Sequence, residues 1–324
     1  MPSWNDLAQE FEAQAEPLRG PWLMSRLTGS LASIGQHRGD RNVILCASGF
    51  LQKPNLPGPS SMITHEDLHG MMSAVFGIGD CGKGLTLVLH TPGGVTNAAE
   101  SIVSYLRSKF DDIEVVVPTL AMSAGTMIAL AANRVVMGRQ SQLGPIDPQM
   151  SMPDGRTVSA QAVVEQFKRA QEEVLADQRN AHVWASILPS LGPALLQEAQ
   201  NALDYSEDMV AQWLAQWMFS NKPDPAQAGR AAAHHFNDAS THKSHGRRIG
   251  RDEARAQDIV VEELEDNQDL QEAVLTLYHL MTLVFEQTPA AKLVWTDAGR
   301  SWMKNVPVAG PPSVPARPPG PTGP

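Results

Sequence analysis

The sequence predicts an α/β protein built on a parallel sheet. Three apolar segments of strand length, residues 42–50, 85–89 and 113–117, are each followed by a segment in which apolar residues recur at helical spacing. Alternation of this kind is typical of parallel strands joined by crossover helices, which are right-handed. Two of the strands end at residues that cannot continue a ladder, one at Pro92-Gly93-Gly94 and the other at Pro118.

The first 40 residues are expected to form an N-terminal helical arm, with helices over residues 3–15 and 21–34. Residues 41–306 are expected to form the main domain. Residues 307–324 are so rich in Pro and Gly that a disordered tail is expected there. The domain boundaries predicted from sequence are therefore 1–40, 41–306 and 307–324.

The region after the third strand is predicted to be mostly helical. A helix from Ala124 to near Asn133 precedes a short strand at residues 134–138 and an extended segment at 141–148. Residues 158–187 read as one long helix, and Ser206 as the cap of another. Two apolar stripes lie outside the sheet pattern and are expected to be core or subunit interface. Their apolar excess favours interfaces, which predicts a homo-oligomer of three or more copies. These stripes are Met209/Trp213/Trp217 and Leu277/Met281/Phe285.

Composition narrows the choice of partners and compartment. The 324 residues carry a net charge of −10, which argues against nucleic acid or an anionic membrane surface as the main partner. The two cysteines, Cys46 and Cys81, show no pairing or metal-ligand pattern, as expected in a reducing compartment. No targeting segment or apolar stretch of about 18 residues is present, so a cytoplasmic protein without a membrane span is expected.

Ser123 is the candidate nucleophile, because it stands where the third strand turns into a helix. Backbone N–H groups and the positive end of the helix dipole face this position. Ala124 and Gly125 follow and are small enough to let a peptide approach. Gly94, on the preceding turn, can present its N–H to the same place. A hydroxyl beside two backbone donors suits acyl transfer, although a serine at a helix start is also the ordinary N-cap.

The motifs HTPGG at 90–94, AMSAGTMIALAA at 121–132 and LGPIDPQ at 143–149 resemble the serine dehydrogenase proteinase family. That family is related to Clp protease proteolytic subunits and to signal peptide peptidase A, within the crotonase-like superfamily. The resemblance implies a repeated β-β-α superhelix with a parallel sheet and a helical insertion. It also implies a cofactor-free serine endopeptidase, with Ser123 as nucleophile and an oxyanion hole from the N–H groups of Gly94 and Ala124.

The resemblance suggests the other members of a Ser-Asp-His site. Asp147 is the candidate acid, in a place where Clp-type subunits have a histidine. The segment from His245 onward matches the histidine region of archaeal members, which makes His245 the candidate base and His242 the second choice. Lys168 is the candidate for a Ser/Lys dyad of the signal peptidase kind. The four histidines between 234 and 245 are not expected to bind metal.

Two other classes of function are compatible with the residues. A crotonase-type acyl-thioester enzyme would use the same pair of backbone donors, and Ser123 would then be incidental. A non-catalytic oligomeric scaffold would bind partners through its N-terminal helices and Pro-rich tail. The substrate expected from the first reading is a peptide or an unfolded protein.

Overall fold

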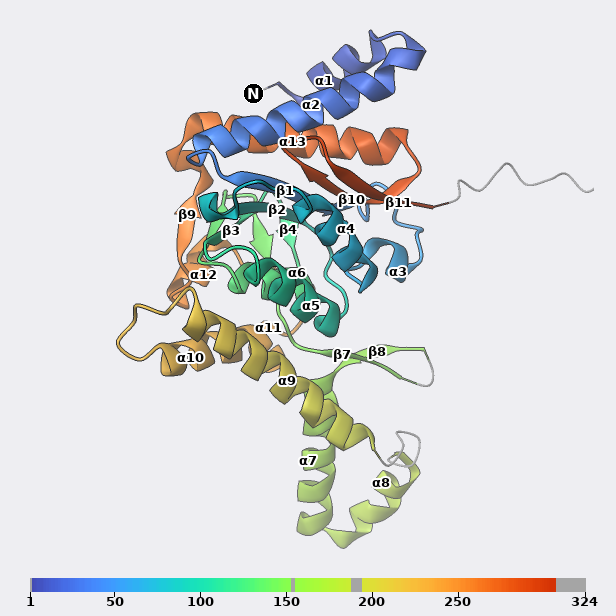
Figure 1. The fold of residues 1–324 in the computed structure, drawn as a ribbon. Coiled ribbons are helices and arrows are strands. Elements are labelled where there is room, and N and C mark those ends of the chain that lie inside the picture. The colour runs from blue at the N-terminus through green and yellow to red at the C-terminus, as the bar shows by residue number, and fades with distance from the viewer. Residues whose placement is uncertain (1, 153–154, 188–193, 307–324) are drawn as a thin grey trace, which may run out of the picture.

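A computed structural model of the protein describes residues 2–152, 155–187 and 194–306. A mostly parallel seven-stranded sheet forms its centre, in the order β11-β10-β1-β2-β3-β5-β9 (Figure 1). The predicted strands are confirmed, and β10 and β11 extend the sheet in antiparallel fashion beyond β1. The strands are β1 (Asn42–Ser48), β2 (Leu85–His90), β3 (Ile113–Val117), β5 (Arg134–Met137), β9 (Val261–Glu263), β10 (Ala290–Thr296) and β11 (Ser301–Asn305).

A second, smaller ladder runs beyond the ends of the parallel strands. It consists of β4 (Leu120–Ala121) paired in parallel with β6 (Gln142–Leu143), and a bridge joins Thr91 to Ala121. A strand in the large sheet, a short segment in the small ladder and a helix therefore follow one another repeatedly. This is the expected repeated β-β-α superhelix.

Helices cover both faces of the large sheet (Figure 1). Alternate side chains of each strand point to opposite faces, so Leu45 and Val88 join one core while Cys46 and Leu87 join the other. On one face lie α1 (Trp4–Glu12), α2 (Glu16–His37) and α13 (Gln268–Gln287). On the other lie α4 (Glu66–Val75), α5 (Thr96–Arg107), α6 (Ala124–Leu130), α9 (Leu195–Gln216) and α10 (Pro225–Asn237).

The helical insertion extends away from the sheet (Figure 1). It comprises a hairpin of β7 (Gln149–Ser151) and β8 (Thr157–Ser159), then α7 (Ala160–Ala176), α8 (Ala181–Ile187) and the first part of α9. A small apolar cluster of its own, which includes Val163, Val164 and Leu195, holds it together. The remaining short elements of the described residues are α3 (Gly58–Ser61), α11 (Ala239–His242), α12 (Arg251–Ala256) and 3-10 turns at Cys81–Lys83, Gln178–Asn180 and Leu264–Asp266.

Three of the helix assignments made from sequence are wrong in detail. Helix α2 begins at Glu16 and carries Pro21 in its interior. The predicted helix starts at residue 21 because the apolar stripe that α2 buries begins only at Leu23. The long helix predicted at 158–187 breaks at Asp177, whose extended backbone and side chain cap the following 3-10 turn. Ser206 lies inside α9, where its hydroxyl donates to the carbonyl of Ala202 at 3.0 Å.

The two apolar stripes predicted to be subunit interfaces are packed within the protein. Leu277, Met281 and Phe285 are fully buried between α13 and the sheet. Met209 is buried too, and Trp213 and Trp217 pack against the same core. A buried helix and an interface helix show the same periodic stripe in sequence, so this argument for assembly is wrong.

The expected disordered tail, residues 307–324, lies outside the described residues. Across the part of the chain that the structure describes, every helix is too short or too polar to cross a membrane.

Candidate active site

The HTPGG turn and the Ser123 turn are joined side by side through the small ladder. The Thr91 N–H donates to the carbonyl of Leu120 at 3.0 Å, and the Met122 N–H donates to the carbonyl of Thr91 at 3.1 Å. Gly125 has to be a glycine here, because a Cβ on it would lie 2.4 Å from Cγ2 of Thr91. The two turns that sequence analysis singled out therefore form one structure.

Ser123 occupies the N-cap position of α6 but does not cap it. Its side chain makes no cap hydrogen bond, and its backbone has φ 50° and ψ −117°. A non-glycine residue rarely adopts such a conformation, and holding it costs on the order of 1–3 kcal/mol. Strain of this kind gathers at functional sites, because the surrounding structure has to impose it. Ser123 is therefore not an ordinary N-cap whose side chain accepts a hydrogen bond from the helix.

Two backbone N–H groups are candidate donors to a ligand, that of Ala124 directly after Ser123 and that of Gly94 on the adjoining turn. Among the described residues, neither the Ala124 N–H nor the Gly94 N–H donates a hydrogen bond to a protein acceptor. Neighbouring groups are engaged: the Gly125 N–H donates to Met122 and the Gly93 N–H donates to Thr91 Oγ1. Free backbone donors of this kind are suited to a developing oxyanion.

Gly93 sets the contact between the two turns, which gives a first prediction. A Cβ added to Gly93 would lie 2.6 Å from Cβ of Ser123 and 2.7 Å from the carbonyl oxygen of Met122, and Gly93 has φ +100°. Gly93→Ala should therefore displace Ser123 and lower kcat/KM for peptide hydrolysis by about 100-fold, the cost of a misplacement of roughly 1 Å. A steady-state assay with a peptide substrate measures this.

The control is Gly79→Ala, because a Cβ at that exposed turn meets nothing within 4 Å. It should hydrolyse the peptide at the rate of the unmodified protein. Full activity of Gly93→Ala would contradict the placement of Ser123 against this turn.

His90, the first residue of the HTPGG motif, has a structural place. It is fully buried, its ring stacks on Phe50 with centroids 5.0 Å apart, and its Nδ1 lies 3.0 Å from Thr119 Oγ1. Burial lowers the pKa of His90 to about 4, so the ring is neutral at neutral pH. A ring that is so weakly basic and so deeply buried is a poor acceptor for the proton of a serine.

Asp147 and His245 are brought together, although 98 positions separate them in the chain. His245 Nδ1 lies 2.7 Å from Asp147 Oδ1. Because a carboxylate only accepts, Nδ1 carries the proton and donates it, which leaves Nε2 as the ring's potential base. Asp147 is 2% exposed, whereas the His245 side chain is 29% exposed. A buried acid that orients a more exposed imidazole is the arrangement expected of an acid and base pair.

Gln149 is a site residue that sequence analysis missed. Its Nε2 donates to the second oxygen of Asp147, Oδ2, at 2.7 Å. The carboxylate is thereby held by His245 on one oxygen and by Gln149 on the other. The only sequence signal was the position of Gln149 at the end of the LGPIDPQ motif.

Hydrogen bonds connect the Asp147 segment both to the Ser123 turn and to the His245 segment. The Thr126 hydroxyl donates to the carbonyl of Ala121 at 2.8 Å and accepts from the Gly144 N–H at 2.9 Å. Leu143 and Ile249 exchange two backbone hydrogen bonds of 2.9 Å each. Within the described residues no hydrogen bond joins Ser123 to His245.

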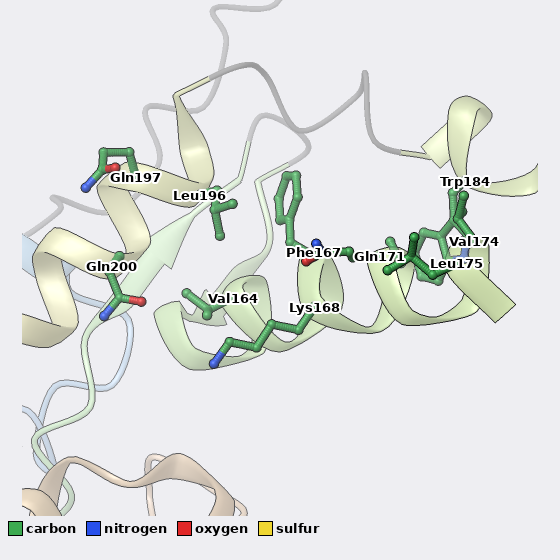
Figure 2. Close-up of a pocket in the computed structure, with 11 residues that line it drawn as sticks. Val164, Phe167, Lys168, Gln171, Val174, Leu175, Trp184, Leu196, Gln197 and Gln200 are labelled. Atoms are coloured by element: carbon green, nitrogen blue, oxygen red, sulfur yellow. The ribbon is translucent and has the colours of Figure 1, made fainter. Parts of the chain in front are cut away.

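The two alternative bases have other contacts. His242 is 3% exposed, and its Nε2 contacts the carbonyl of His235 while its Nδ1 contacts Arg247. Lys168 is on α7 in the insertion, where it lines a pocket with Val164 and Phe167 (Figure 2). Helix α7 and helix α6, which begins after Ser123, lie apart in Figure 1.

A pocket of about 360 Å³ opens beside the Asp147–His245 pair. Its other walls come from β8, the start of α7 and the segment around α11, and they carry mostly polar side chains. These include Thr157, Ser159, Gln161, Glu165 and Lys243.

Comparison with known proteins confirms the resemblance over the centre of the chain. Residues 59–184 match the family described as ClpP-like SDH-type serine proteinase. This match covers the Ser123 turn, the Gly94 turn and Asp147, but not His245.

Two uncharacterized proteins of Methanocaldococcus jannaschii are similar. MJ0137 is 46% identical over 68 residues, which are 21% of this chain and 24% of that protein. MJ1495 is 36% identical over 90 residues, 28% of this chain and 29% of that protein. The chain thus spans less than a third of these relatives.

Two solved structures of the 1510-N membrane-bound stomatin-specific protease, one in complex with a substrate peptide, are also similar. They are 21% and 22% identical to this chain, each with a TM-score of 0.27. Each match covers 33% of this chain, and 54% and 51% of those structures.

Proposed function

Because residues 59–184 carry the sequence of a ClpP-like SDH-type serine proteinase, we propose that this protein is a serine peptidase that cleaves peptides or unfolded proteins. The observation that carries the proposal is Ser123 itself. Its hydroxyl makes no cap hydrogen bond, its backbone is held at φ 50°, and within the described residues the N–H groups of Ala124 and of Gly94 on the adjoining turn have no acceptor. These features suit a nucleophile that forms an acyl-enzyme.

In the proposed reaction, His245 Nε2 takes the proton of the Ser123 hydroxyl as its oxygen attacks the peptide carbonyl carbon. Asp147 keeps the proton of the imidazole on Nδ1 and stabilises the imidazolium that forms. The N–H groups of Gly94 and Ala124 donate to the oxyanion, each worth about 3 kcal/mol in comparable sites. The imidazolium then protonates the leaving amine, and water, activated by the same imidazole, releases the acyl group from Ser123.

The arrangement of the pair favours this mechanism over a Ser123–Lys168 dyad. A dyad needs a neutral lysine close to the serine, which requires the lysine to be buried beside it. Lys168 instead lines the pocket between α7, α8 and α9. The acyl-thioester alternative would leave the strain at Ser123 without a role, and the scaffold alternative would also leave the Asp147–His245 pair without one.

The test of the proposed function is hydrolysis of an unfolded protein, such as reduced and alkylated casein, by the purified chain. New peptide N-termini should accumulate with time, and a serine-reactive fluorophosphonate should stop them. Hydrolysis that persists after complete reaction with the fluorophosphonate would contradict a serine mechanism. No hydrolysis of any unfolded protein or peptide would contradict the peptidase itself.

We further propose that copies of the chain assemble through the insertion. A pocket of about 650 Å³ lies between α7, α8 and α9, lined mostly by apolar side chains that include Phe167, Trp184 and Leu196 (Figure 2). Leu175 is 78% exposed beside it. Apolar surface of this kind is usually covered in a stable protein, and a second copy offers the same surface in return.

Light scattering should therefore give a mass above that of one 35.1 kDa chain. Leu175→Asp should lower the mass toward that of one chain, since it places a charge on the apolar surface. Leu18→Asp, at an exposed position on α2, is the control and should leave the mass unchanged. A monomer mass for the unmodified protein at micromolar concentration would contradict the assembly.

A further inference from the structure

Three side chains that the proposed mechanism does not use come together near one another, and they come from the elements that precede and follow the His245 segment in the chain. His235 on α10, His242 on α11 and Glu253 on α12 each offer one ligand atom, and these atoms lie within 4.8 Å of one another. Imidazole nitrogen and carboxylate oxygen are ligands that Zn²⁺ accepts.

The hydrogen bonds of His242 fix which of its ring nitrogens is available. Its Nε2 lies 2.6 Å from the carbonyl oxygen of His235, and its Nδ1 lies 2.9 Å from Nη1 of Arg247. A carbonyl only accepts and a guanidinium only donates, so Nε2 carries the proton and Nδ1 holds a lone pair. Histidines that bind metals are commonly oriented in this way, by donation from the other ring nitrogen to a carbonyl or carboxylate.

His235 and Glu253 are already at the separation of two ligands on one ion. His235 Nε2 lies 3.4 Å from Glu253 Oε1. Bonds of about 2.0–2.1 Å at tetrahedral angles place two zinc ligands about 3.3 Å apart. The His235 Nε2 atom is buried and has no hydrogen-bond partner in the described part of the chain. A buried nitrogen left in this way is a group that a ligand would satisfy.

A positive group already stands among these ligands. Nη1 of Arg247 is 2.6 Å from Glu253 Oε1 as well as 2.9 Å from His242 Nδ1. The Arg247 side chain is 38% exposed, so it can turn outward to water. We propose that His235, His242 and Glu253 form a binding site for Zn²⁺, which an incoming ion occupies by displacing the guanidinium of Arg247.

Binding of Zn²⁺ at this site would change the position of the proposed base, His245. Arg247 closes a turn on Ser244, its N–H donating to the Ser244 carbonyl at 3.0 Å, and His245 lies inside that turn. Release of Arg247 from Glu253 removes one of the side-chain anchors of the turn, so the hydrogen bond from His245 to Asp147 should weaken. Zn²⁺ is therefore an inhibitor of peptide hydrolysis. This consequence rests on the proposed function, whereas the binding of Zn²⁺ does not.

The binding is tested with Co²⁺ as a spectroscopic probe and Zn²⁺ as its competitor, on the full chain. Co²⁺ should give the visible absorption of a tetrahedral site, and Zn²⁺ should abolish it. His235→Ala and Glu253→Gln should each weaken binding by at least tenfold. Arg247→Gln should tighten it by at least tenfold, because the competing cation is gone. His234→Ala and His245→Ala are matched controls, and each should bind Co²⁺ as the unmodified protein does.

Unchanged Co²⁺ binding in His235→Ala and Glu253→Gln would overturn the site, and so would Arg247→Gln binding no more tightly than the unmodified protein. Loss of binding in His245→Ala would place the metal on the Asp147–His245 pair instead.

The inhibitory role is tested separately, by adding Zn²⁺ during hydrolysis. Glu253→Gln should resist inhibition, and an active protein that binds Zn²⁺ without slowing would overturn that role alone. Absence of all hydrolysis would remove the proposed function and leave the binding result standing.

Discussion

Ser123→Ala should abolish peptide hydrolysis, with a fall in kcat of about 10⁵-fold or more, as for the loss of the nucleophile in other serine peptidases. The hydroxyl oxygen is the atom that forms the acyl-enzyme, and alanine has no substitute for it. The substitution removes no cap hydrogen bond from α6, so the protein should fold and melt at nearly the same temperature. Steady-state kinetics and thermal unfolding together measure both effects.

Ser104→Ala provides the control, because Ser104 is an exposed serine on α5. It should keep full activity. A Ser123→Ala variant with more than a hundredth of normal kcat would show that Ser123 is not the nucleophile, and another group would then have to carry out the hydrolysis.

His245→Ala and Asp147→Asn should have the second largest effects. Loss of the base should lower kcat by about 10⁵-fold, and the asparagine variant by about 10⁴-fold. Asparagine keeps the shape of the buried Asp147 side chain but no longer holds the proton of His245 on Nδ1, so the imidazole presents the wrong nitrogen to Ser123. Because the two residues act as one unit, the double variant should be scarcely worse than His245→Ala alone.

Lys168→Ala distinguishes this pair from the dyad. Lys168 lines the pocket of the insertion, and its loss should change kcat less than twofold. If Lys168→Ala were inactive and His245→Ala active, the dyad would be the correct mechanism. His242→Ala is less useful, because His242 is 3% exposed and its truncation would also disturb folding.

The parts of the fold that the sequence predicts well are those with a simple physical signal. Apolar strands such as 85–89 and the turn at Ser123 are visible because each break, at Pro92 or at Pro118, follows directly from backbone chemistry. The pairing of Asp147 with His245 came only through the family resemblance. Periodicity alone does not relate residues so far apart in the chain.

The remaining errors share a cause, because each depends on tertiary contacts. The stripe Leu277/Met281/Phe285 reads the same whether a helix packs on its own sheet or on a neighbour, and here it packs on its own sheet. The role of Gln149 depends on where Asp147 points, and the cluster of His235 with Glu253 depends on how α10 and α12 meet. Spacing in the sequence contains neither kind of information.

The most direct test of the central claim is reaction with a fluorophosphonate, read as intact mass and then by peptide mapping. The unmodified protein should gain the mass of one phosphonyl group, located on Ser123, while Ser123→Ala should gain none. His245→Ala should react far more slowly, because the imidazole that activates the hydroxyl is missing. Equal labelling of the unmodified protein and Ser123→Ala, or labelling located on another serine, would contradict the account.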